Sequence, residues 1–73
     1  MGRYMRIRDP QELEARFQEE KDWYTYAEIA EGCELSESTI SNAFAKNPIK
    51  VETAKSIAKR LGLKAFEIAD RVQ

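Results

Sequence analysis

Apolar residues recur at helical spacing along most of the chain, and cap signals divide this pattern into segments. Asp9-Pro10-Gln11-Glu12 has the features of a helix start, with a first-turn proline and a reciprocal glutamate. Thr25-Tyr26-Ala27-Glu28 is a second capping box ahead of a compact apolar face. The spacing predicts helices over residues of about 10–21, 26–33, 37–45, 51–61 and 65–71.

The last three predicted helices are bounded by equally clear signals. Ser36 caps the third, and Asn47-Pro48 ends it because the residue before a proline is pushed out of the helical region. Gly62 is suited to a left-handed C-terminal cap of the fourth. In the fifth, the residues expected to close the core are Phe66, Ile68 and Ala69.

The first residues have a different pattern. Met5 and Ile7 alternate with Arg6 and Arg8, as in a short strand. Because the rest of the pattern is helical, no partner strand is expected within the chain. We therefore interpret 1–8 as a basic arm, either flexible and frayed or strand-like and paired with a second subunit. Residues 9–73 are then a single domain of the all-α class, a compact four- to five-helix bundle.

Size and composition fit this interpretation. Seventy-three residues suffice for one small domain, and 42% hydrophobic with 34% charged residues is typical of a globular protein. No apolar run approaches the roughly 20 residues of a membrane span. The basic start MGRYMRIRDP is not followed by a continuous apolar segment, so a secretory signal is not expected and the cytoplasm is the expected location.

The chain has little catalytic chemistry to offer. It contains one cysteine, Cys33, and no histidine, which excludes zinc fingers, His-based catalysis and an internal disulfide. Cys33 lies on the apolar side of the second predicted helix, where we expect a small core residue. The carboxylates and lysines show no recognisable catalytic spacing. We expect no enzyme activity, no cofactor or metal, and no small-molecule substrate.

A net charge of −1 conceals an uneven distribution. Residues 1–8 contain three arginines, residues 9–37 contain ten acids against two bases, and residues 38–73 contain seven bases against three acids. A positive face could therefore contact phosphate while the first helix keeps an acidic, solvated side. Ordinary scatter of solubilising charge is the simpler alternative.

Residues 26–45 predict two short helices joined by a three-residue turn, which is a helix-turn-helix. Ala30 is small where the helices would cross, and Ile29, Leu35 and Ile40 would fill the angle between them. The second helix is polar on its other side. Such a face needs no packing if it enters a major groove and meets base edges and phosphates.

The segments TYAEIAEGCELSESTISNAF, KNPIKVETAKSIAKRLGL and FEI together resemble the helix-turn-helix domains of Cro and of lambdoid phage repressors, the XRE family. Three motifs agree: Thr-x-x-Glu-Ile-Ala, Leu-Ser-x-x-Thr-Ile-Ser and Thr-Ala-x-x-Ile-Ala-x-x-Leu-Gly. The resemblance implies a lambda repressor-like fold whose third helix reads double-stranded DNA. It further implies a phage or mobile-element transcriptional regulator that binds a two-fold operator as a homodimer.

The resemblance also implies roles for individual residues. The base-reading side of the third helix corresponds to Glu37, Ser38, Ser41 and Asn42. Asn42 is the foremost of them, because an amide can both donate to and accept from adenine. The positions corresponding to phosphate contacts are Thr25, Tyr26, Thr39, Lys46, Asn47 and Lys50.

Two positions depart from the family pattern. Glu34 occupies the turn position usually filled by glycine, so a residue with a Cβ must adopt the left-handed conformation, at about 1 kcal/mol, or the turn must differ. Gly32, two residues earlier, could let the backbone adjust. Glu37 places a carboxylate at the groove entry, where it can accept from cytosine N4 but also repels phosphate.

Other interpretations of the sequence remain open. A protein-interaction module of the same fold, antirepressor or antitoxin-like and with weak or no DNA binding, is favoured by the acidic first helix and by Glu37. A bundle whose sequence specifies only its fold is a third alternative. Any dimer would use the N-terminal arm, the last helix or the loops, with contacts expected at Phe66, Ile68 and Val72.

Overall fold

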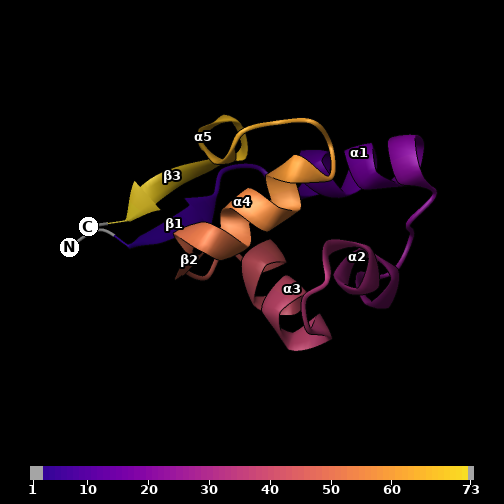
Figure 1. Cartoon of the computed structure of the whole chain (residues 1–73), viewed down its shortest axis with the longest axis horizontal. Coiled ribbons are helices and arrows are strands. Elements are labelled where there is room, and N and C mark those ends of the chain that lie inside the picture. The colour runs from indigo at the N-terminus through magenta and orange to yellow at the C-terminus, as the bar shows by residue number, and fades with distance from the viewer. Residues whose placement is uncertain (1–2, 73) are drawn as a thin grey trace.

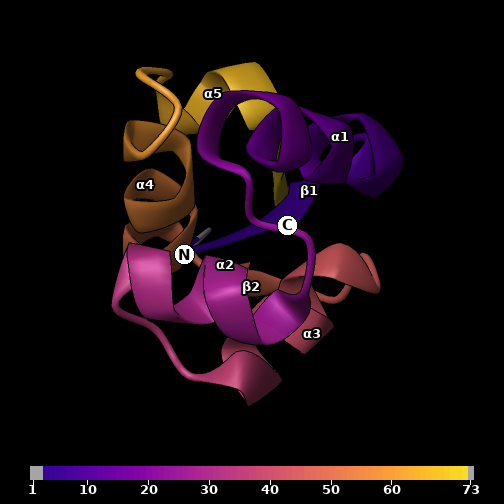
Figure 2. The same cartoon turned by 90° about the vertical axis from the view of Figure 1, so that its right-hand side faces the viewer.

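The computed structural model describes residues 3–72, and within them five helices accompany a three-stranded antiparallel sheet. The sheet forms one end of the molecule (Figure 1), and α2 and α3 lie on the side opposite α1 and α5 (Figure 2). The prediction of an all-α fold was therefore wrong. The elements in chain order are β1 (Tyr4–Ile7), α1 (Pro10–Lys21), α2 (Tyr26–Cys33), α3 (Glu37–Phe44), β2 (Ile49–Lys50), α4 (Val51–Lys59), α5 (Ala65–Ile68) and β3 (Ala69–Val72).

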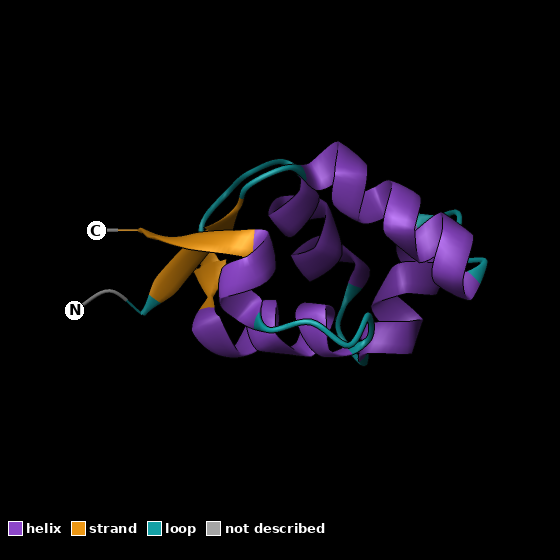
Figure 3. Cartoon of the chain, turned by 90° about the horizontal axis from the view of Figure 1, so that it is seen from above, coloured by secondary structure: helices purple, strands orange, loops and turns teal. Residues whose placement is uncertain are grey.

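The N-terminal segment is the central strand of this sheet, whose order is β2-β1-β3 (Figure 3). Met5 lies opposite Ile49, and Ile7 lies opposite Ala69. The side chains of Met5 and Ile7 are buried, whereas those of Tyr4 and Arg6 face outward. The alternation in the sequence predicted a strand, but the expectation that it has no partner within the chain was wrong.

The last predicted helix was also wrong in its second half. Residues 65–68 are helical as α5, but Ala69 is extended (φ −146°, ψ 155°) and β3 follows. Arg8 stabilises this change of direction: its Nη2 donates to Phe66 O (2.6 Å) and to Ala69 O (3.3 Å). The carbonyls that a short helix leaves without helical partners thus find a donor on Arg8, the residue after β1.

The remaining helices start at the expected residues, and α3 ends at Phe44, one residue before the expected end. α1 and α2 have the expected bounds, and Asp9 and Thr25 each accept a hydrogen bond from a first-turn backbone N–H. α4 ends at Lys59, before the expected position, because its last turn tightens into shorter-range bonds. Gly62 (φ 71°) then acts as the expected left-handed cap, and Leu63 N donates to Ala58 O (3.0 Å).

The core lies between the sheet and the helices. Its most deeply buried large side chains include Phe17, Ile29 and Ile57. Trp23 packs on Phe17 with ring centroids 5.5 Å apart. Ile68 and Ala69 are buried in the core as expected, but Phe66 is not: it lies on the exposed side of α5, and 66% of it is exposed.

Gly32 has a different role from the one expected. It lies inside α2, and its φ is not in the left-handed region. A Cβ at this position would overlap the six-membered ring of Trp23. Gly32 is therefore needed for space under an aromatic ring and does not help the backbone to turn.

Candidate nucleic-acid interface

The turn between α2 and α3 keeps a tight geometry without glycine. Glu34 adopts the left-handed conformation (φ 60°, ψ 41°), which is the first of the two alternatives considered from the sequence. Leu35 N then donates to Ala30 O (2.9 Å), closing the end of α2. Arg60 at the end of α4 lies 3.7 Å from the Glu34 carboxylate, but the Glu34 side chain is 84% exposed, so this ion pair adds little.

α3 divides cleanly into a buried and an exposed side. Ile40 and Ala43 are fully buried, and Phe44 is nearly so. Spacings of one, four and five residues place the opposite side chains in one stripe along the helix. All members of this polar stripe are exposed, and they are the four residues expected to read bases: Glu37, Ser38, Ser41 and Asn42.

The start of α3 is fixed by its own side chains. Ser36 Oγ accepts from Thr39 N (3.1 Å), which is the expected N-cap. The Ser36 and Thr39 hydroxyls also share a hydrogen bond of 2.8 Å. Thr39 is half-buried over the turn, so it stands apart from the polar stripe.

The end of α3 brings two amides together. Asn47 Nδ2 donates to Asn42 Oδ1 (3.4 Å), and Asn47 N donates to Asn42 O (3.1 Å). The first bond occupies one of the two acceptor sites of Asn42 Oδ1, so the exposed side chain keeps a second acceptor site and both Nδ2 donors for another group. Lys46, between the two asparagines in the chain, adopts the left-handed conformation (φ 66°) that turns the backbone back toward α3.

The N-terminus of α2 lies beside this helix. Thr25 Oγ1 accepts from Glu28 N (3.1 Å), which leaves the hydroxyl proton of Thr25 available to a phosphate oxygen. The Tyr26 ring packs against Phe44 of α3, with centroids 5.3 Å apart. Tyr26 is therefore half-buried and braces the angle between the two helices.

Positive charge flanks α3 and is not part of it. Glu37 is the one charged residue in the sequence of α3, whereas Lys46 and Lys50 follow the helix and are exposed. Arg6 of β1 joins them, because its Nε donates to Lys46 O (3.0 Å). Sequence reasoning did not include Arg6 among the contact residues. The alternating sequence of residues 4–7 indicated that Arg6 faces outward from a strand. It did not indicate the contact with Lys46, which lies forty residues later in the chain.

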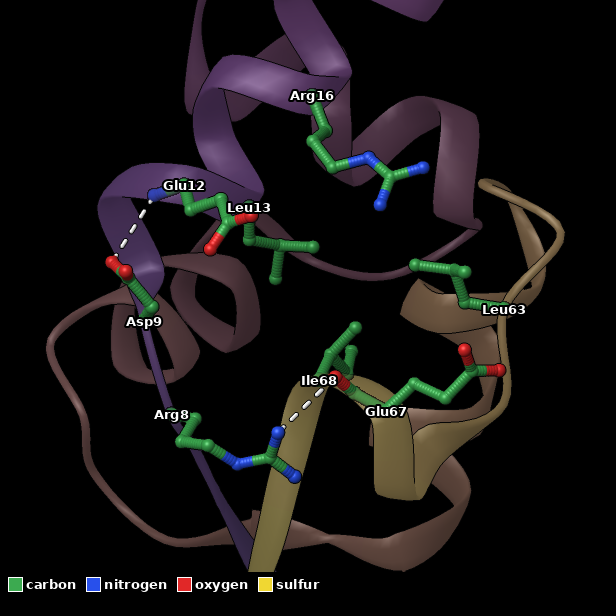
Figure 4. A pocket seen from close by; sticks show the side chains of 8 residues that line it. All are labelled: Arg8, Asp9, Glu12, Leu13, Arg16, Leu63, Glu67 and Ile68. Carbon is green, nitrogen blue, oxygen red and sulfur yellow. Dashed lines mark hydrogen bonds between the residues drawn. The ribbon is translucent and has the colours of Figure 1, made fainter.

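A second group of charges lies between α1 and α5, around a hollow of about 120 Å³ (Figure 4). Its two arginines are already engaged. Arg16 pairs with Glu20 (3.0 Å), and Arg8 with Asp70 (3.1 Å). Acids of α1 and α5 also line the hollow, so it offers no consistent charge to a ligand.

Cys33 is only 2% exposed, and burial raises the pKa of its thiol to about 11, although Arg60 acts in the opposite direction. The thiol is therefore protonated and unreactive at neutral pH. Among residues 3–72, no three histidine, cysteine, aspartate or glutamate side chains are arranged so that they could hold a metal ion.

Comparison of the chain with protein-family models, with curated proteins and with solved structures finds no match. None of the helices in the part of the chain that the structure describes is both long enough and apolar enough to cross a membrane.

Proposed function

We propose that this protein is a sequence-specific DNA-binding transcriptional regulator of the Cro or repressor type, acting with α3 in the major groove. The observation that carries the proposal is the polar stripe of α3. Its four side chains are exposed together on a helix whose opposite side is buried and whose two ends are fixed by hydrogen bonds. A helix of this kind can approach base edges without unfolding or disturbing the core.

The stripe supplies hydrogen-bond donors and acceptors that suit base edges. Asn42 can donate to and accept from adenine, and Glu37 can accept from cytosine N4. Ser38 and Ser41 can bond to base edges or phosphates through their hydroxyls. The backbone contacts that would set the register of the complex are proposed for Thr25, Tyr26, Thr39, Lys46, Asn47 and Lys50.

A homodimer on a two-fold operator is part of the proposal. β3 is an edge strand, and within residues 3–72 no strand pairs with its outer side. An unpaired edge is a template for pairing with a second chain, and the exposed Phe66 lies just before it. Ile68, one of the contacts expected from the sequence, is buried and is not available for such an interface. The regulator would act in the cytoplasm, at the nucleoid.

The test is a titration of the protein into fluorescent duplexes, including one selected by the protein from a random pool. We expect specific binding that weakens between about 50 mM and about 200 mM salt, because released counterions drive phosphate contacts. A protein that selects no sequence and binds no duplex at low salt would refute the proposal.

One observation favours the alternative, a protein-interaction module of the same fold. Glu37 and Glu34 are both exposed at the start of the α3 region, where they repel phosphate. If no duplex is bound, this antirepressor or antitoxin-like function becomes the preferred one. The variant Glu37→Gln separates the two functions: it should strengthen binding to DNA of random sequence, where the carboxylate only repels phosphate, and weaken binding to a basic protein partner.

A further inference from the structure

A hollow of about 160 Å³ opens where the end of α3 meets the sheet. Arg6 and Arg8 line it from β1 and the residue after it, and Asp70 and Arg71 line it from β3. Lys46 closes it from the loop after α3. We call this hollow, with its four cations and one carboxylate, the sheet cleft.

Part of this charge is already matched within the protein. Arg8 Nε donates to Asp70 Oδ1 (3.1 Å), and Arg8 Nη2 is bound to the main-chain oxygens at the end of α5. Arg6 and Lys46 differ, because neither forms an ion pair with a carboxylate in residues 3–72. The sheet cleft therefore keeps an excess of positive charge that an anion would neutralise.

Arg6 is held in a defined position. Its Nε donates to Lys46 O (3.0 Å), which fixes the guanidinium against the loop after α3. Tyr4 and Arg6 share the outer face of β1, and Lys50 lies opposite Tyr4 on β2. Arg6 thus contacts the backbone of Lys46, a residue already proposed as a phosphate contact, and Asp70 lies opposite Arg6 on β3.

The sheet cleft adjoins the C-terminal end of α3, where Lys46 and Asn47 are already proposed as phosphate contacts. α3 contributes no cation, so the flanking residues must supply the charge that attracts and positions phosphate. Arginine is suited to this task because its planar fork can present two donors to one phosphate group.

We propose that the sheet cleft is a phosphate-binding site of this protein, with Arg6 as the main ligand and Lys46 beside it, and that it takes a backbone phosphate of the bound duplex. This inference rests on the proposed function and extends the DNA interface from the helix-turn-helix onto β1. A purely structural role for Arg6 is the competing explanation, because a cation that bonds a carbonyl at the end of α3 also stabilises the helix.

The variant Arg6→Gln separates the two roles, since glutamine can still donate to Lys46 O but carries no charge. Arg6→Ala removes both the charge and the donor. Lys64→Gln is the matched control, because it removes one exposed charge next to α5, on the other side of the molecule from α3. Each variant is compared with the wild type in thermal unfolding and in duplex binding over a range of salt concentrations.

We expect Arg6→Gln to weaken binding to every duplex alike and to flatten the dependence of log affinity on log salt by about 0.9 for each phosphate that is no longer neutralised. Each such phosphate changes the ratio of wild-type to variant affinity by about 3.5-fold between 50 mM and 200 mM salt. The melting temperature of Arg6→Gln should stay close to that of the wild type, and Lys64→Gln should leave the salt dependence nearly unchanged. An Arg6→Gln variant with wild-type affinity and salt dependence would overturn the inference, whatever its stability.

A duplex with single neutral methylphosphonate linkages locates the contact. One such substitution should weaken binding of the wild type and have no effect on Arg6→Gln. If every linkage affects both proteins equally, Arg6 touches no phosphate and the inference is wrong while the proposed function stands. If the wild type binds no duplex at all, the proposed function itself has failed.

Discussion

Gly32→Ala tests how the helix-turn-helix is held in place. The added methyl group would overlap the six-membered ring of Trp23, which packs on Phe17 of α1. Either the ring leaves this position, or α2 shifts away from α1. In both cases the packing of α2, the first helix of the helix-turn-helix, is disturbed, and α2 is the helix against which α3 packs.

The expected magnitude follows from two opposing terms. Alanine in place of glycine inside a helix stabilises by about 1 kcal/mol. Losing the ring packing costs roughly 0.5–1.5 kcal/mol beyond the lost burial of the indole, and forcing a shift in a packed region costs roughly 1–3 kcal/mol. We therefore expect Gly32→Ala to lower the free energy of unfolding by up to about 2 kcal/mol if α2 shifts, and by more if the indole loses its burial, the reverse of its effect in an open helix.

The assay is urea unfolding followed by circular dichroism, in the wild type and in a Trp23→Leu background. Leucine ends before the position of the six-membered ring, so the overlap disappears. In that background Gly32→Ala should stabilise the protein by up to about 1 kcal/mol. An equal effect of Gly32→Ala in both backgrounds, or a stabilised single variant, would refute the steric argument.

Three further predictions concern the turn, the buried thiol and the sheet. Glu34→Gly should raise the free energy of unfolding by roughly 1 kcal/mol in urea denaturation, because glycine adopts φ 60° without strain and the exposed ion pair with Arg60 contributes little. The Cys33 thiol ionises near pH 9.0 when unfolded and near 11 when folded, so its contribution to stability is full below pH 9.0 and is lost as the pH rises to 11, by up to about 3 kcal/mol. A Cys33→Ala variant with the same decline over that window in pH-dependent urea unfolding would contradict this. Arg8→Gln should destabilise the β1–β3 pair and speed amide hydrogen exchange in Ala69–Val72; unchanged exchange there would show that the Arg8 bonds to α5 are not needed.

The helices were predictable because their signals are local. The N-caps Asp9, Thr25 and Ser36 each lie three residues before the backbone N–H that they bond. A short stretch of sequence is therefore enough to predict where each of these helices begins. The same is true of the polar stripe, which follows from helical spacing once α3 is assigned. The sequence predicted that either Glu34 is left-handed or the turn differs, but it could not decide between the two. That decision depends on whether the packing of the whole turn outweighs the strain of a left-handed Glu34.

The sheet was not predictable in this way. β1 and β3 lie more than sixty residues apart, and Ala69–Val72 has apolar spacing that fits a helix as well as a strand. What decides between them is a partner strand and the bonds from Arg8 to α5, which no local pattern contains. The contact between Arg6 and Lys46 was hidden for the same reason.

The central claim is that the polar stripe of α3 reads bases, and Asn42→Ala tests it most directly. Asn42 is exposed, so its truncation should leave the fold intact, and binding to the selected duplex should weaken by about 1–3 kcal/mol per subunit. Preference at one base pair should relax, whereas Lys46→Ala should weaken binding to all sequences alike. The measurement is the affinity of wild type, Asn42→Ala and Lys46→Ala for the selected duplex and all its single-base variants. An Asn42→Ala protein with unchanged affinity and unchanged preference at every base pair would contradict the account.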